Sequence, residues 1–267
     1  MSSATPNSGA NAAAVPAGAT SLTECRALGM VEKAESIGAL ANLLRSLCAS
    51  YTTHATHMVV LRLPLPLPPG GGAPPGGLST LLRLTRRLPV QVVHPSASAA
   101  RQSNPFLDDP PERWEVRHEG PLIQGPALNS LPASMREVTD AACWGAGALE
   151  FWKGMGGKVE YECYREGNEY LVVFHGHEIK VVLASVYALQ EPGVLRDGSS
   201  VKRLGGPGTT GMAVEVALLV PEGRHYEGAN LLGAFGAQLA PHVRLARAEA
   251  PPPGAAAAGG PAGARRR

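Results

Sequence analysis

The spacing of apolar residues divides the chain into short strands and a few helices. Residues 22–30 alternate, with Cys25 and Ala27 on one side of an extended chain and charged residues such as Glu24 on the other. A period of two predicts a strand. Apolar residues then recur at three- and four-residue steps, which predicts a helix over 35–50 with one apolar stripe. The stripe consists of Ile37, Leu40, Leu43, Leu44 and Leu47.

The remaining elements follow from the same two periods. Strands are predicted at 57–63, 78–84, 89–93, 114–118, 136–144, 212–220 and 243–247. Helices are predicted over 147–155 and 226–240. The segment 157–189 alternates most clearly, and Gly167 and Gly176 interrupt it. It therefore predicts a three-stranded antiparallel meander with turns at these two glycines.

Many short strands and about three helices, without regular βαβ alternation, predict the α+β class. The antiparallel sheet is expected to curl into a barrel related to the tunnel-barrel architecture, in a single domain over 22–249. Tails 1–21 and 250–267 and low-complexity insertions 64–77 and 95–111 are rich in Ala, Gly, Pro and Ser. Ordering a residue costs about 1–2 kcal/mol of backbone entropy, which such side chains do not offset. We therefore expect disordered tails and flexible insertions.

Charge and cysteine content exclude several classes of protein. The 24 Lys and Arg residues nearly balance the 22 Asp and Glu residues, so no general attraction to nucleic acid is implied. The four cysteines, at 25, 48, 143 and 163, form no C-x-x-C pair, which indicates free thiols in a reducing compartment. No apolar run reaches 18 residues, so no membrane partner is expected.

Candidate chemistry is sparse. Glu160 and Glu162 share one strand face and could hold a metal inside a barrel, as in the E-x-E-x-K strand of tunnel phosphohydrolases, but Tyr164 stands where that motif has Lys. The alternative is a solvated strand face. His175 and His177 flank a predicted hairpin tip without a third nearby ligand. We therefore assign no catalytic, cofactor-binding or metal-binding residue and expect no cofactor.

Several segments, in order, resemble the Mediator head-module subunit 18 family over about residues 22–249. They are Glu24 to Gly29, Leu40 to Cys48, Trp114 to Arg117, Leu149 to Gly156, Ile179 to Val182, Val214 to Gly223 and Leu239 to Val243. The Ala, Gly and Pro content of the insertions is typical of a GC-rich genome, and we expect a green-plant or algal-like member.

The resemblance implies a non-enzymatic structural subunit of the Mediator coactivator complex. Such a subunit bridges regulators and the RNA polymerase II transcription machinery in the nucleus through protein–protein contacts. Its implied partners are a subunit 20-like barrel and a subunit 8-like helix, without membrane or direct nucleic-acid contact.

Trp144, Phe151 and Trp152 surround a short predicted helix and are the candidate partner interface, since aromatic residues are enriched in interface centres. Alternatively, they close one end of the barrel. A second function is also open: a barrel phosphohydrolase acting on triphosphate compounds. That enzyme needs inward acidic and basic residues on several strands, whereas the predicted strands offer mainly Val, Leu, Ala and Ile.

Overall fold

The computed structural model describes residues 22–64, 79–88, 112–125, 130–189, 201–204 and 211–247. Both predicted tails, nearly all of the two predicted insertions and the predicted strand 89–93 lie outside these residues. Pro64, predicted to begin the first insertion, ends a strand instead.

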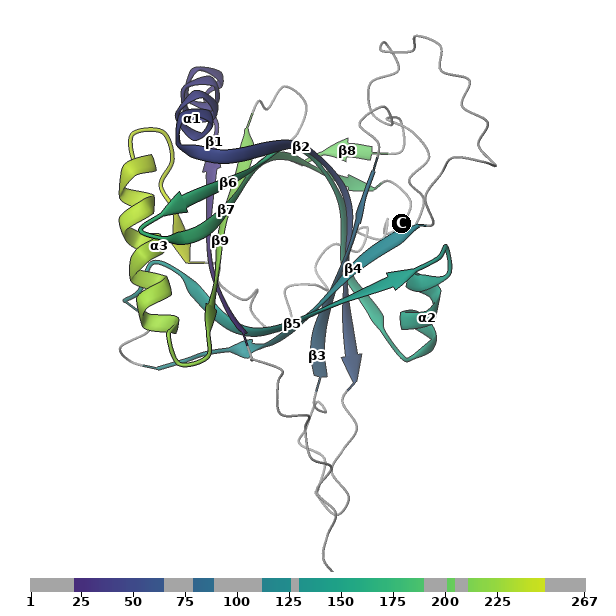
Figure 1. The fold of residues 1–267 in the computed structure, drawn as a ribbon. Coiled ribbons are helices and arrows are strands. Elements are labelled where there is room, and N and C mark those ends of the chain that lie inside the picture. Colours follow the sequence, from purple (N-terminus) through teal and green to yellow (C-terminus); the bar gives the residue numbers. More distant parts are fainter. Residues whose placement is uncertain are drawn as a thin grey trace, which may run out of the picture.

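Eight antiparallel strands close into a barrel (Figure 1). They are β1 (Leu22–Val31), β2 (Cys48–Pro64), β3 (Ser79–Arg87), β4 (Arg113–Leu122), β5 (Ser134–Trp144), β6 (Lys158–Phe174), β7 (His177–Leu189) and β9 (Met212–Pro221). Around the barrel the order is β1-β5-β4-β3-β2-β6-β7-β9, and β9 pairs with both β7 and β1 to complete the circle. Two short strands lie off this circle: β8 (Val201–Arg203) pairs with β7, and β10 (Ala246–Arg247) with β1. The predicted α+β barrel is confirmed.

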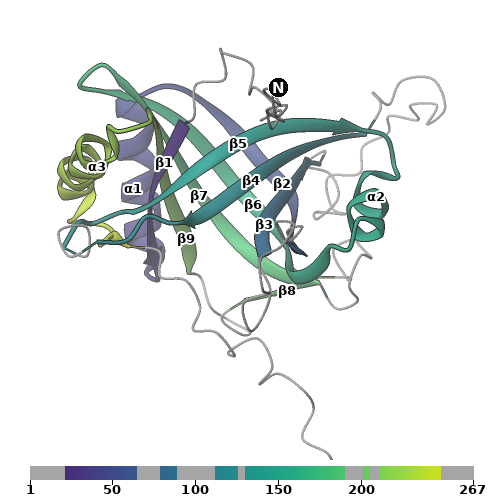
Figure 2. The ribbon, with the colours of Figure 1, turned by 90° about the horizontal axis from the view of Figure 1, so that it is seen from below.

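The three helices of the described residues lie outside the barrel wall (Figure 2). On one side are α1 (Ala34–Leu47) and α3 (His225–Leu239), and on the opposite side is the short α2 (Ala148–Gly154). The predicted stripe of α1 is confirmed up to Leu44, because Leu40 and Leu44 are fully buried, whereas Leu47, predicted to belong to it, is exposed. The helix ends at residue 47 and not at 50, where the chain has already entered β2.

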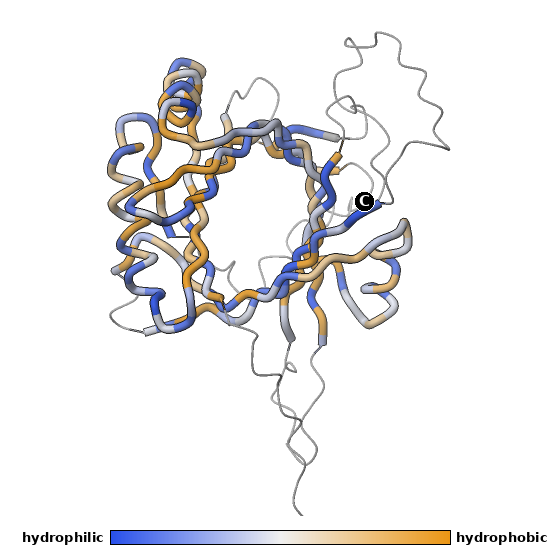
Figure 3. Tube along the Cα trace, in the orientation of Figure 1, coloured by the Kyte–Doolittle hydropathy of each residue, from blue (hydrophilic) through white to orange (hydrophobic). Residues whose placement is uncertain are grey.

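The main hydrophobic core lies between the barrel wall and the helices. Along β9, the residues Val214, Val216 and Leu218 belong to one buried cluster with Leu232 and Phe235 of α3. The same apolar wall, seen beside α3 in Figure 3, continues into β1 and β7. Each barrel strand has two faces, and in this fold the helices pack against the apolar face. The other face of each strand is left to line the interior.

A second, smaller cluster lies on the opposite outer side, under α2. It includes Val59, Leu61, Leu84, Trp114 and Ala148. The barrel is therefore held by apolar contacts on its outside at two places. Each cluster joins a helix to strands that are distant in sequence.

The predicted turn at Gly167 is wrong, because β6 runs without interruption through it and pairs along its length with β2 and β7. An added Cβ at this position would lie 2.0 Å from the carbonyl oxygen of Leu183 on β7. Glycine is therefore required by the close approach of two strands and not by a turn. The turn at Gly176 is confirmed, with φ of 78°, and the meander has two strands in place of three.

Candidate functional site

The barrel encloses a cavity of about 900 Å³. All eight barrel strands contribute to its lining, which carries as many basic as acidic residues. The basic ones are Arg83, Arg113, Arg117, Arg165 and Lys180, and the acidic ones are Glu24, Glu115, Asp140, Glu178 and Glu215. The interior predicted from the sequence, mainly Val, Leu, Ala and Ile, is therefore wrong. The sequence predicted the alternation of the strands correctly but assigned the apolar face to the wrong side.

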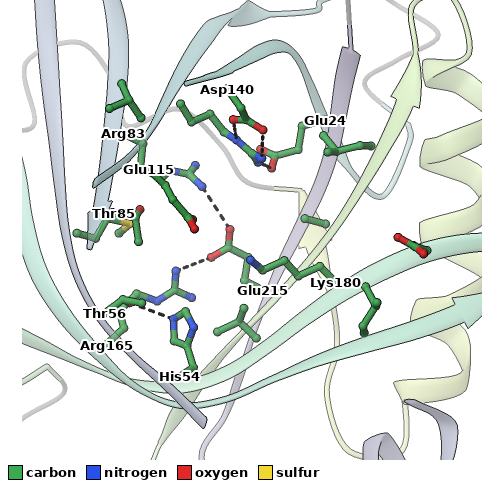
Figure 4. A pocket seen from close by; sticks show the side chains of 18 of the residues that line it. Glu24, His54, Thr56, Arg83, Thr85, Glu115, Asp140, Arg165, Lys180 and Glu215 are labelled. Atoms are coloured by element: carbon green, nitrogen blue, oxygen red, sulfur yellow. Dashed lines mark hydrogen bonds and ion pairs between the residues drawn. The ribbon is translucent and has the colours of Figure 1, made fainter. Parts of the chain in front are cut away.

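Glu215 of β9 is the centre of the charged lining. Arg165 of β6 contacts its carboxylate at 2.8 Å, and Arg83 of β3 lies 3.7 Å from it on the other side (Figure 4). The side chains of all three are at most 15% exposed. Since these residues come from three strands, the ion pairs connect the barrel wall across its interior.

Two further acidic residues extend this network. Glu24 of β1 contacts Arg117, which also donates two hydrogen bonds, of 2.7 and 2.8 Å, to the Asp140 carboxylate. Glu119 of β4 contacts Arg83 and lies 3.5 Å from Arg26. Because buried charges are costly unless paired, these contacts account for the presence of so many ionisable groups inside the barrel.

A third group of charges joins β2, β6 and β7. The Glu169 carboxylate lies 2.9 Å from the Lys180 ammonium group and 3.4 Å from the His54 ring. The His54 ring is also within 3.1 Å of the Thr56 hydroxyl. His54 lies on β2 and is buried.

Burial and pairing set the protonation of these groups in opposite directions. Burial raises the pKa of Glu24, and the charges of Arg83 and Arg117 oppose that rise. Burial also acts to raise the pKa of Glu215, but Arg165 and Arg83 outweigh it and lower the pKa to about 2. Glu215 is therefore ionised at neutral pH. Burial lowers the pKa of His54 despite its contact with Glu169, which favours the neutral ring.

The acidic pair on β6 does not line the cavity. Glu162 lies 2.6 Å from the His57 ring, which packs against Trp114 in the smaller outer cluster, and Glu160 pairs with Arg62. The alternative of a simple solvated face is only partly right, since the Glu162 side chain is 7% exposed. Within the described ranges, no group of three or more His, Cys, Asp or Glu residues has a geometry that could hold a metal ion.

His175 and His177 lie at the tip of the β6–β7 hairpin, as predicted. His177 reaches Glu227 at the start of α3, at 3.8 Å, and borders the cavity. The candidate interface residues are gathered around α2. Trp144 and Phe151 are 62% and 57% exposed, whereas Trp152 packs partly against the smaller outer cluster.

None of the three candidate aromatic residues borders the cavity. The alternative in which they close the barrel end therefore has no support in this arrangement. Arg113 lies over the Trp144 ring at 5.3 Å, and Phe151 meets Trp152 edge-on at 5.2 Å. Trp144 and Phe151 are thus exposed on the outside of the barrel, and we call these two residues with Trp152 the α2 surface.

The interior charges were the functional feature that the sequence interpretation missed. Their signal was present, because Glu24 and Arg26 on β1 and Glu215 on β9 alternate with apolar residues. The sequence does not show on which side of the barrel wall the helices pack, and this decides which face of each strand points inward.

The fold and cavity define the class: a closed, eight-stranded antiparallel α+β barrel with a charged interior cavity and helices on its outer wall. No helix among the described residues has the length and apolar character needed to span a membrane. No protein-family model and no curated protein matches the sequence.

Solved structures do resemble this fold. A chain in the Mediator head module of Schizosaccharomyces pombe is similar with a TM-score of 0.56 and 16% identity, over 85% of this chain and 98% of that chain. The PH1819 protein of Pyrococcus horikoshii matches with a TM-score of 0.41 and 11% identity, over 80% of this chain and 89% of that chain. A putative adenylyl cyclase of Hippeastrum, described as having dominant triphosphatase activity, matches at 0.39 and 10%, over 86% of this chain and 92% of that chain.

Proposed function

We propose that this chain is a structural subunit of a Mediator-type coactivator complex and acts through protein–protein contacts in the nucleus. The observation that carries this proposal is the fold similarity to a chain of the S. pombe Mediator head module, which extends over 98% of that chain. A similarity over nearly the whole length supports a common architecture better than a shared barrel core would. The proposal includes no catalytic role and no cofactor.

The α2 surface is the proposed contact site for the partners, a second barrel subunit and a tethering helix. Trp144 and Phe151 are more than half exposed, although both are large apolar side chains. Neighbouring Met155, which follows α2, is 61% exposed. Aromatic and Met side chains are enriched in interface centres.

The test is affinity purification of the tagged chain from its own cells, followed by identification of the chains that purify with it. The double variant Trp144→Ala, Phe151→Ala is expected to lose its partners, since hot-spot aromatic residues contribute about 2 kcal/mol or more each, about 30-fold in affinity. Its own unfolding midpoint should stay close to that of the wild type. Tyr226→Ala, which removes a 45% exposed aromatic residue on α3, is the matched control.

Purification of the wild-type chain without transcription proteins would contradict the proposed function. Loss of partners in Tyr226→Ala but not in the double variant would move the interface to the opposite side of the barrel.

The charged interior favours a second candidate, the barrel phosphohydrolase. Acidic and basic residues on several strands are the condition that this reading requires, and the cavity meets it. Against it, three carboxylates of the barrel interior, Glu24, Glu119 and Glu215, are already in contact with arginine. We expect no release of phosphate from tripolyphosphate with Mg²⁺ or Mn²⁺. Turnover that is lost in Glu215→Gln and kept in Glu160→Gln would establish the enzyme.

A further inference from the structure

The interior cavity has a size and a lining that the proposed assembly role does not use. Its volume of about 900 Å³ is within the range of about 300–1,000 Å³ that is usual for small-molecule sites. Its polar groups come from strands that are held rigidly by the closed sheet. Because the backbone of these strands is fixed, binding a ligand costs less conformational entropy.

The buried centre of the cavity holds two arginines that each keep an unused hydrogen-bond donor. Glu215 is approached by both Arg83 and Arg165, and Lys180 is close enough to help lower its pKa. The Nε atoms of both arginines are buried and have no hydrogen-bond acceptor among the described residues. The acidic lining residues Glu115 and Glu178 are exposed, whereas the buried carboxylates Glu119 and Glu24 contact Arg83 and Arg117.

An apolar strip begins directly beside these cations. Lys180 of β7 is paired with Leu171 of β6 and with Ala217 of β9, so the three side chains form one row on the inner wall. Two residues further along β9, Leu219 also borders the cavity and is 40% exposed. Covering such a surface contributes about 25 cal/mol per Å² of apolar area.

We propose that the barrel interior binds a small organic anion, with its carboxylate or phosphate group between Arg83 and Arg165 and its apolar part along Leu171, Ala217 and Leu219. The carboxylate of Glu215 now occupies the place between the two guanidinium groups. It is therefore an internal competitor of the ligand. This site is independent of the α2 surface.

The test is isothermal titration calorimetry of the full chain with octyl phosphate, octanoate and inorganic phosphate at constant ionic strength. Glu215→Gln removes the competing charge and is expected to bind octyl phosphate about tenfold more tightly than the wild type. Arg165→Met is expected to bind it at least about tenfold more weakly, since a hydrogen bond to a charged group contributes about 1.5–3 kcal/mol. Comparison of octyl phosphate with octanoate shows which anionic group is preferred.

Glu160→Gln is the matched control, because it removes an arginine-paired carboxylate outside the cavity, and its affinity should equal that of the wild type. Leu219→Gln should weaken octyl phosphate without changing inorganic phosphate. This variant also keeps the test open if Glu215→Gln does not fold, since Leu219 is partly exposed. The proposal is overturned if the wild type shows no saturable binding of octyl phosphate or octanoate, or if all variants bind equally. Neither result bears on whether the chain purifies with transcription proteins.

Discussion

Replacing Glu215 by glutamine is expected to lower the free energy of unfolding at pH 7 by about 3 kcal/mol. Although burial opposes ionisation, Arg165 and Arg83 reduce the pKa of this carboxyl from 4.5 to about 2. At about 1.4 kcal/mol per pH unit, that difference corresponds to about 3 kcal/mol. The side chain is only 15% exposed, so solvent screens the pairs little. Breaking a buried ion pair by removing one partner has a similar cost, about 3–5 kcal/mol.

The same pairing gives the effect a defined pH dependence. Because the pKa is lower in the folded state, the carboxylate stabilises the fold fully above pH 4.5. That contribution is lost as the pH falls from 4.5 towards 2. The difference between wild type and Glu215→Gln should therefore be largest near neutrality and shrink through this acidic range.

Urea denaturation followed by tryptophan fluorescence at pH 7, 5 and 3 measures the difference. Glu160→Gln is the control, because its pair with Arg62 is outside the cavity and partly exposed, and exposed pairs contribute about 1 kcal/mol or less. A difference below about 1 kcal/mol between wild type and Glu215→Gln at pH 7 would refute the reasoning. So would a difference that does not decrease at pH 3.

Two further predictions concern packing and thiol reactivity. Gly167→Ala places a Cβ against the backbone of a neighbouring strand and should destabilise the fold by about 1–3 kcal/mol. Gly38→Ala, in open space on α1, should stabilise the fold by up to about 1 kcal/mol. Thermal unfolding of the two variants measures both effects. Burial raises the pKa of Cys25 to about 12 and of Cys163 to about 11, so both should react with a disulfide reagent at pH 8 only after denaturation. Rapid reaction of all four cysteines in the native protein would contradict this.

Much of the local structure could be predicted because it depends on neighbouring residues. The spacing of apolar residues predicts both α1 and β9, since each carries an uninterrupted apolar face in the sequence. Gly167 was misinterpreted because a glycine in a strand and a glycine in a turn look alike in sequence. The contact with Leu183 that requires it joins residues of different strands. Only the paired structure reveals it.

The candidate site shows the same division more sharply. The sequence by itself determined that β1 has one apolar and one charged face. It also determined that Glu215 alternates with apolar residues on β9. It did not determine which face points into the barrel, because a period of two is the same for both orientations. The tertiary structure decided this by placing α1 and α3 outside. The apolar faces are buried against those helices, and the charged faces, left to the interior, are stabilised there by pairing with residues from other strands.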